Sequence, residues 1–261
     1  MHPMLNIAIR TVRQAGNIII KYYETIDSNE YKQKNYHDCV KYIEKETKRQ
    51  MTIMILKSYP QHQIITESNH EIHTESKNTE WIINALDGNI NYIKHFPYFS
   101  ISIAIRIKGR NEIAVIYDPM RNEVFRAWRG HGAQLNGYRL RGGIVRDLEH
   151  AILSTNCSFK INPNITSYLN ITQKLLSQCL DFRRSGSVAL DLAYVASGRI
   201  DGYLAFNLKP CDFAAGELLI REAGGLVTDF NGSNNYFYSG SFISGNARIV
   251  KNILTYINSQ K

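Results

Sequence analysis

The sequence predicts a mixed α/β (α+β) protein built in layers, and three observations lead to this fold class. The first part of the chain holds two segments whose apolar side chains recur at helical spacing. Short apolar runs separated by turn residues follow, a pattern typical of antiparallel strands. After residue 150 strand and helix patterns alternate, as in α/β proteins. We therefore expect two halves, residues 1–150 and residues 151–261. Because no repeat or low-complexity linker separates them, they should pack closely.

The N-terminal half begins with two predicted helices. Residues 3–25 place apolar side chains on one helical face, and a polar loop leads to a second helix over residues 38–59, which Pro60 ends. The apolar runs that follow predict strands, two of which flank Gly109 and Arg110 as a hairpin. The glycine-rich residues 130–143 predict turns and a sheet edge. The expected strands are residues 63–67, 80–86, 98–108, 111–118 and 123–128.

The C-terminal half alternates between the two element types. Asn246 belongs to a residue type that often caps helix N-termini, and it precedes a last helix with apolar residues at helical spacing. The other expected helices are residues 165–179, 187–198 and 213–223, and the expected strands are residues 151–155, 181–185, 201–206, 226–230 and 241–244.

The composition is ordinary for a soluble globular protein. The 261 residues are 44% hydrophobic and 21% charged. No apolar run reaches the roughly 20 residues that cross a bilayer, and no signal peptide is visible at the start. The four cysteines lack the spacing of a metal site, so we expect reduced thiols and a cytoplasmic location without membrane contact.

The net charge of +8 leaves two interpretations open. A basic surface favours nucleic acid, here sequence-independent RNA binding. The alternative, which we favour, is a solvated sheet edge with its loops, because no nucleic-acid-binding motif accompanies the charge. Nucleotide bias in the genome is a further explanation, since it raises lysine content without any selection for binding polyanions. Much of the charge lies in nine residues: Arg106, Lys108, Arg110, Arg121, Arg126, Arg129, Arg139, Arg141 and Arg146.

Three acids stand at the ends of predicted elements and suggest a metal site. Glu67 closes an apolar run, Asp87 ends the strand that begins near Trp81, and Asp212 opens a helix. Hard cations such as Mg2+ prefer oxygen ligands held rigidly. Gly88, which follows Asp87, lets a backbone approach a ligand closely. The simpler alternative is that Asp87 and Asp212 only cap helices.

Longer motifs carry a resemblance that spans nearly the whole chain. The densest stretches are residues 1–6, 81–91, 100–109, 117–123, 132–141, 181–184 and 212–217. In these the chain resembles the inositol monophosphatase family, and most of all a bacterial branch of it. The resemblance implies an αβαβα sandwich of the sugar phosphatase type, Mg2+-dependent hydrolysis of inositol phosphates, and a homodimer. For the bacterial branch it also implies partnership with RNA polymerase and Nus factors in antitermination of ribosomal RNA transcription.

The resemblance also assigns site residues. Glu67 matches an acid that holds metal and orients the attacking water, and Asp87 and Asp212 match two further metal ligands, as does the Leu86 carbonyl. Gly88 and Asn89 match the phosphate cradle. Substrate binding would thus use Glu67, Leu86, Asp87, Gly88, Asn89 and Asp212, joined by Arg183 from a stretch that contributes to the substrate pocket or the subunit interface.

Several departures from the family pattern fall around this same site. The pattern WxxDPLDGTTN appears as WIINALDGNIN, so Asn84 replaces the acid that would bridge two metals. Asn89 and Ile90 replace two threonines, one of which positions the nucleophilic water. Ala205 stands where a glutamate grips an inositol hydroxyl. The remaining departures are Ser68, Lys41, Glu44 and Cys211, and Lys41 would bring positive charge near the metal pocket.

These departures lead to two functional hypotheses. Asparagine keeps one oxygen but loses the charge that lets a carboxylate span two cations. We therefore favour an interaction protein of the antitermination complex whose phosphatase activity and Mg2+ binding are weak or lost. The alternative is a working Mg2+-dependent inositol-1-monophosphatase that uses the three remaining acids.

Overall fold

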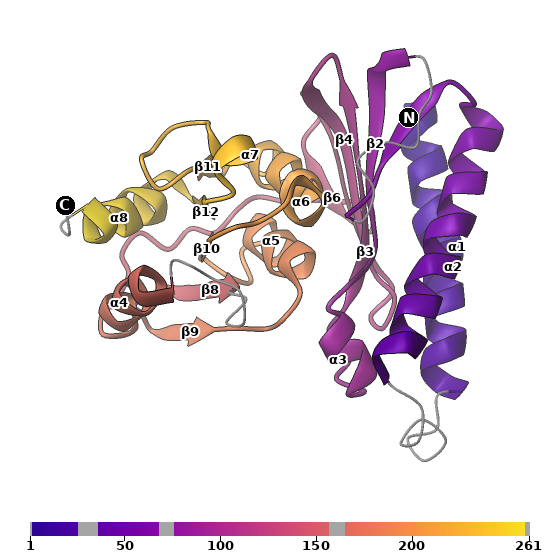
Figure 1. Ribbon diagram of the computed structural model, residues 1–261. Helices are drawn as coiled ribbons and strands as arrows, with labels where there is room; N and C mark the ends of the chain where they lie inside the picture. Colours follow the sequence, from indigo (N-terminus) through magenta and orange to yellow (C-terminus); the bar gives the residue numbers. More distant parts are fainter. Residues whose placement is uncertain (1, 26–35, 68–75, 157–164, 259–261) are drawn as a thin grey trace.

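The computed structural model describes residues 2–25, 36–67, 76–156 and 165–258. Its elements stack as helices, sheet, helices, sheet, helices, so the expected αβαβα sandwich is confirmed (Figure 1). Three clusters of buried apolar side chains lie at the layer boundaries: one under the N-terminal helices, one between the sheets, and one under the C-terminal helices. No helix within the described ranges is long and apolar enough to cross a membrane.

A seven-stranded sheet forms from the first half of the chain, with its strands in chain order. β1 runs parallel to β2, and every later pair is antiparallel. The expected strands are present, but β2 begins earlier than predicted, and the glycine-rich segment contributes two short strands. The strands are β1 (His62–Ile65), β2 (Ser76–Asp87), β3 (Ser100–Ile107), β4 (Arg110–Asp118), β5 (Glu123–Trp128), β6 (Ala133–Leu135) and β7 (Tyr138–Arg139).

Two long helices, α1 (Pro3–Thr25) and α2 (Tyr36–Ser58), cover one face of this sheet (Figure 1). Leu5, Val12 and Ile19 lie on the buried face of α1, as the helical spacing predicts. They pack against every second residue of the strands, since alternate side chains point to opposite faces of a sheet. The opposite sheet face is therefore free to meet the C-terminal half.

The second sheet has the order β11-β12-β10-β8-β9. β8, β9 and β10 are parallel, while β12 is antiparallel to both of its neighbours. All five strands lie where the alternating pattern places them, with shorter bounds at several ends. They are β8 (Ile152–Asn156), β9 (Asp181–Arg183), β10 (Gly202–Ala205), β11 (Leu226–Thr228) and β12 (Phe242–Gly245).

Helices α5 (Val188–Ala196) and α6 (Pro210–Glu222) fill the space between the sheets, while α4 (Ile165–Leu176) and α8 (Ala247–Asn258) cover the far face (Figure 1). Asn246 caps α8 as expected, because its Oδ1 accepts the backbone N–H of Arg248 and of Ile249, both at 3.0 Å. Two short helices, α3 (Asn89–Ile93) and α7 (Tyr236–Ser239), complete the list.

The start of α6 differs from the prediction. The helix begins at Pro210 rather than at residue 213, so Asp212 lies inside its first turn. Proline suits the first helical position because its missing N–H has no partner there in any case. Asp212 Oδ2 accepts the backbone N–H of Lys209 at 2.9 Å, which closes the turn. Asp212 is thus held by the helix start and faces the layer between the sheets.

Candidate functional site

Asp87 lies at the end of β2, at the junction of the two halves. The pairing of β2 with β3 is irregular between Asn84 and Asp87. Asp87 Oδ2 accepts hydrogen bonds from Ser187 Oγ at 2.6 Å and from the backbone N–H of Ala189 at 2.8 Å. Asp87 therefore caps α5, a helix about a hundred residues further along the chain. The helix that follows Asp87, α3, has Gly88 at its N-cap and no side-chain cap, so Asp87 caps a distant helix instead of the one that the sequence suggested.

Electrostatics indicates how close the three acids lie. Burial raises the pKa of Asp87 to about 7, and the negative charge of Asp212 adds to the rise. Burial likewise raises the pKa of Asp212 to about 6, and the charge of Glu67 adds to it. The charge of Asp212 acts on Asp87 and that of Glu67 acts on Asp212, so the three acids lie in one region of the fold, which we call the acidic cluster. That they form a metal site stays a prediction.

A basic residue that the sequence prediction missed lies at this cluster. Lys209 Nζ is 3.0 Å from Glu67 Oε1, and both side chains are more than half exposed. The same residue precedes α6 and donates its backbone N–H to Asp212. The only sequence signal was its position directly before Pro210, since the pairing with Glu67 links residues far apart in the chain. Lys209 thus contacts two of the three predicted metal ligands.

The segment after Asp87 forms a tight turn into α3. Gly88 has φ +89°, and a Cβ at this position would lie 2.9 Å from the carbonyl oxygen of Tyr98. The glycine is therefore required by both conformation and space. Asn89 and Ile90 are exposed, with 70% of Ile90 accessible. Asn91 Nδ2 donates to the carbonyl oxygens of Tyr98 and Ser185, at 2.7 and 2.8 Å, and so ties α3 to the loop before α5.

The other predicted site residues separate into two groups. Leu86 is buried next to Asp87, and Ala205 is fully buried at the end of β10. Asn84 is half-buried on β2. Arg183, by contrast, lies on β9 at the edge of the second sheet and pairs with Asp181 at 2.9 Å. No described contact joins Arg183 to the acidic cluster.

The further departures from the family pattern contribute little to the cluster. Ser68 lies outside the described residues. Lys41 is exposed on α2, and no contact in the described part of the chain brings it to the acids, so the extra positive charge comes from Lys209 instead. Glu44 pairs with Lys48 within α2. Cys211 is buried beside Asp212, and burial raises the pKa of its thiol to about 12, so it stays protonated at neutral pH.

The buried carboxylate of Asp191, which was not predicted from the sequence, stabilises the elements around the site. Asp191 on α5 accepts hydrogen bonds from Tyr98 Oη at 2.6 Å and from Ser154 Oγ at 2.8 Å. Burial raises its pKa to about 6. Tyr203 Oη is buried nearby without a hydrogen-bond partner among the described residues. Asp191 links α5 to β8 and to Tyr98, which precedes β3, and so holds together elements near Asp87.

The donor set of this cluster does not fit a pair of Mg2+ ions. Within the described residues, no group of three or more His, Cys, Asp or Glu side chains is arranged to hold a metal ion. One oxygen of Asp87 and one of Asp212 are used in capping, and the Lys209 ammonium lies against Glu67. Asn84 offers a neutral oxygen where two dications need a shared anion.

Comparison with known proteins identifies the family. A model of the inositol monophosphatase family matches residues 1–260, and the chain therefore belongs to this family. It is 56% identical to the Escherichia coli K12 protein named Nus factor SuhB, over 97% of this chain and 95% of that protein. It is 47% identical to the Vibrio cholerae protein of the same name, over 98% of this chain and 96% of that one.

Solved structures agree with this assignment. The crystal structure of the extragenic suppressor protein suhB from Bartonella henselae superposes with a TM-score of 0.89 at 31% identity and covers 98% of this chain and 100% of that one. The inositol monophosphatase from Anabaena gives a TM-score of 0.86 at 29% identity, covering 98% of this chain and 95% of that one. The fold predicted from the sequence and the family resemblance are both confirmed.

Proposed function

We propose that this protein is a Nus-factor-type interaction protein on an inositol monophosphatase scaffold, with weak or lost phosphatase activity. The observation that carries the proposal is the similarity, over nearly the full length, to proteins named Nus factor SuhB. At 56% this identity is well above the 29% identity to the inositol monophosphatase of Anabaena. By this likeness the partners would be RNA polymerase and Nus factors, in the cytoplasm, with the protein acting as a homodimer.

The chemistry of the acidic cluster supports the proposal of weakened catalysis. A unit charge at about 4 Å is worth about 4 kcal/mol at an effective dielectric of about 20, and each ~1.4 kcal/mol is tenfold in rate. Asn84 lacks the charge of a bridging carboxylate, and Lys209 adds a positive charge on Glu67. Both features act in the same direction, against binding of a second cation.

Co-purification tests the interaction proposal. The tagged protein is mixed with RNA polymerase and Nus factors, and the Escherichia coli relative serves as the positive control. We expect retention comparable to that of the relative, and equal retention of the Asn84→Asp variant, because the partner role does not use the cluster. Absence of any association under conditions where the relative associates would refute the proposal.

A working Mg2+-dependent inositol-1-monophosphatase is the second candidate, and the convergence of Glu67, Asp87 and Asp212 favours it. In that case Glu67 and Asn89 would act on the water, and the Leu86 carbonyl and Gly88 would join the acids in binding metal and phosphate. Arg183 would contribute to substrate binding only through a contact with the acidic cluster, and it makes none among the described residues. Steady-state hydrolysis of inositol 1-phosphate separates the candidates.

The two candidates predict opposite results for a triple variant. If the natural protein is inactive, Asn84→Asp with Asn89→Thr and Ala205→Glu should restore measurable hydrolysis. A natural rate within tenfold of an ordinary family member, unchanged by the triple substitution, would establish the phosphatase instead. Thermal unfolding of the variant checks that the buried Ala205 position accepts the larger side chain.

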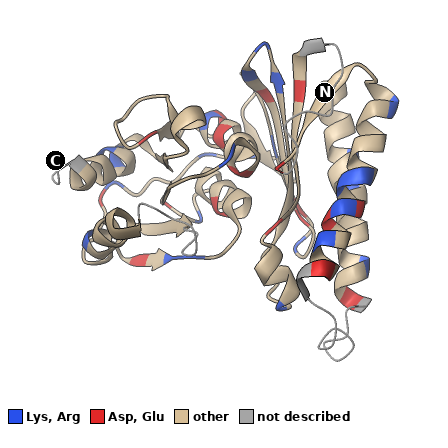
Figure 2. Cartoon of the chain, viewed as in Figure 1, with Lys and Arg blue, Asp and Glu red and all other residues tan. Residues whose placement is uncertain are grey.

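The basic charge gives little support to a broad RNA-binding face. Four of the nine basic residues singled out from the sequence pair with acids: Arg106 with Glu80, Arg110 and Arg129 with Glu112, and Arg121 with Asp118. In the view of Figure 2, acidic and basic residues are interspersed along the outer helices and at the strand ends. This distribution favours the solvated sheet edge over a continuous basic surface that binds polyanions.

A further inference from the structure

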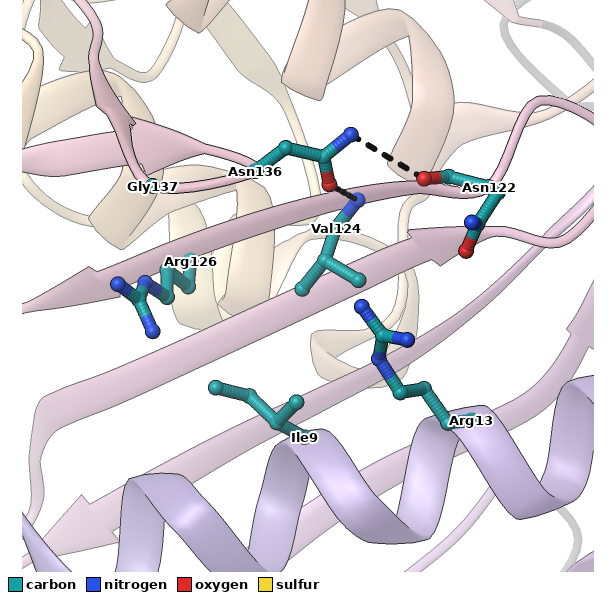
Figure 3. Close-up of a pocket in the computed structure, with 7 residues that line it drawn as sticks. All are labelled: Ile9, Arg13, Asn122, Val124, Arg126, Asn136 and Gly137. Atoms are coloured by element: carbon teal, nitrogen blue, oxygen red, sulfur yellow. Dashed lines mark hydrogen bonds between the residues drawn. The ribbon is translucent and has the colours of Figure 1, made fainter.

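A polar pocket opens between α1 and the first sheet (Figure 3). It lies on the sheet face opposite to the one that meets α5 and α6. Its volume is about 260 Å³. Ile9 and Arg13 reach it from α1, while Val124 and Arg126 reach it from β5 (Figure 3). Asn122 and Asn136 close one end. The pocket exists because the sheet continues through β5 and β6 past the strands that α1 covers.

The charge in this pocket has one sign. Among the described residues that line it there are two guanidinium groups and no carboxylate. Arg13 is exposed and makes no hydrogen bond or ion pair with any described residue. Arg126 is held in place by Gln134, whose Oε1 accepts from Nε at 3.1 Å and from Nη2 at 2.7 Å. Gln134 is a neutral acceptor, so this contact orients the guanidinium without cancelling its charge.

The end of the pocket that Asn122 and Asn136 close is polar and held by hydrogen bonds. Asn136 Oδ1 accepts the backbone N–H of Val124 at 2.9 Å, and its Nδ2 donates to the carbonyl oxygen of Asn122 at 3.2 Å (Figure 3). Both asparagines have positive φ, and the short loop between β6 and β7 is fixed by these bonds. A fixed rim beside two arginines is suited to an anion, since little ordering is needed on binding.

A second pocket of about 290 Å³ adjoins the first and shares Arg126 with it. Trp128 and His131 line it, with ring centroids 3.6 Å apart and planes 20° from parallel. His2 meets Trp128 edge-on, with ring centroids 5.2 Å apart. Leu5 of α1 completes an apolar wall. A flat ring that enters this pocket would therefore meet an aromatic wall beside Arg126.

We propose that these two pockets form a nucleotide-binding site distinct from the acidic cluster. The phosphate of the nucleotide would lie between Arg13 and Arg126, and the base would pack against the Trp128–His131 pair. Guanidinium groups bind phosphate through charge-assisted hydrogen bonds, and aromatic side chains bind bases without selecting their sequence. The nucleotide is either free in solution or one unit of a single strand, and the same chemistry recognises both.

Arg13→Gln is the informative variant, because Arg13 makes no described hydrogen bond whose loss would disturb the fold. Arg10→Gln is the matched control, since Arg10 is exposed on the same helix, carries the same charge and does not line either pocket. Calorimetry measures the binding of inorganic phosphate, AMP, a short single-stranded oligoribonucleotide and a poly-glutamate peptide. The emission of Trp128 reports the location, because the other tryptophan, Trp81, is fully buried in the core.

We expect AMP or the oligoribonucleotide to bind, to change the Trp128 emission, and to bind about tenfold more weakly to Arg13→Gln than to Arg10→Gln. Tight binding of AMP would identify the free nucleotide as the ligand, and a requirement for the oligoribonucleotide would identify the strand. Equal losses in both variants, or binding of both AMP and the oligoribonucleotide no tighter than that of inorganic phosphate, would overturn the proposal. So would an absence of nucleotide binding, or an Arg13-dependent response to poly-glutamate alone.

Discussion

Lys209 Nζ lies 3.0 Å from Glu67 Oε1, and the backbone N–H of Lys209 donates to Asp212 Oδ2 at 2.9 Å. One residue therefore contacts two of the three acids that the sequence assigns to a metal site. Its ammonium group supplies a positive charge from within the chain at the place where the family pattern predicts a divalent cation. This arrangement, together with Asn84, underlies the proposal that catalysis is weak or lost.

Removal of the Lys209 charge should strengthen Mg2+ binding. In the Lys209→Met variant Glu67 loses its internal partner, and repulsion of the incoming cation falls. At the effective dielectric of an exposed site this effect is about 1 kcal/mol, so we expect roughly a fivefold gain in affinity. Calorimetric Mg2+ titration measures it. Lys251→Met, which removes an exposed lysine from α8, is the control, and an equal gain there would show that only net charge matters.

Gly88→Ala should destabilise the protein more than Gly109→Ala. Both glycines have positive φ, at +89° and +78°, so both substitutions cost about 1–2 kcal/mol of backbone strain. At Gly88 the added Cβ also meets the Tyr98 carbonyl oxygen at 2.9 Å, whereas nothing lies within 4 Å at Gly109. We expect a free energy of unfolding lower by about 2–4 kcal/mol for Gly88→Ala, by urea denaturation. Equal losses would show that the close approach is unimportant.

The free energy of unfolding should rise as the pH falls from about 8 to about 5. The pKa of Asp87 is raised to about 7 and that of Asp191 to about 6, while the unfolded chain titrates near 3.8. Between these values the folded state binds more protons than the unfolded state, so lowering the pH favours folding. The gain from these two carboxyls should be on the order of 4 kcal/mol. Above pH 8 these two carboxyls are ionised in both states and no longer contribute to the slope.

Substitution identifies the groups responsible for this pH dependence. Asp87→Asn removes one raised carboxyl and should flatten the slope of unfolding free energy against pH. Asp38→Asn removes an exposed carboxylate at the start of α2 and should leave the slope unchanged. If the free energy of unfolding of the natural protein instead falls as the pH is lowered from 8 to 6, the expectation that these carboxyls are buried without a cation is wrong.

Most of the fold follows from local patterns in the sequence. Helical spacing predicts α1 and α8, and strand alternation predicts the meander from β3 to β5. The misses have physical reasons. α6 starts early because Pro210 occupies its first position and the backbone N–H of Lys209 donates to Asp212. The helical composition after residue 213 does not indicate this start. β6 and β7 are too short for periodicity to indicate them.

The sequence could predict only those candidate site residues that a local motif marks. Glu67, Asp87 and Asp212 stand at element ends in the sequence, and their charges act on one another in the fold; their role as metal ligands stays a prediction. The Lys209–Glu67 pair and the bonds from Ser187 to Asp87 and from Tyr98 to Asp191 join distant segments, so no local pattern indicates them. Whether the halves at residues 1–150 and 151–261 act as separate folding units stays a prediction.

Calorimetric titration of Mg2+ into the natural protein and the Asn84→Asp variant tests the central claim most directly. Asn6→Asp adds the same charge on the exposed face of α1 and serves as the control. The account predicts that the natural protein and Asn6→Asp bind at most one Mg2+ weakly, and that Asn84→Asp binds at least about tenfold more tightly. Two Mg2+ ions bound to the natural protein as tightly as to Asn84→Asp would contradict it.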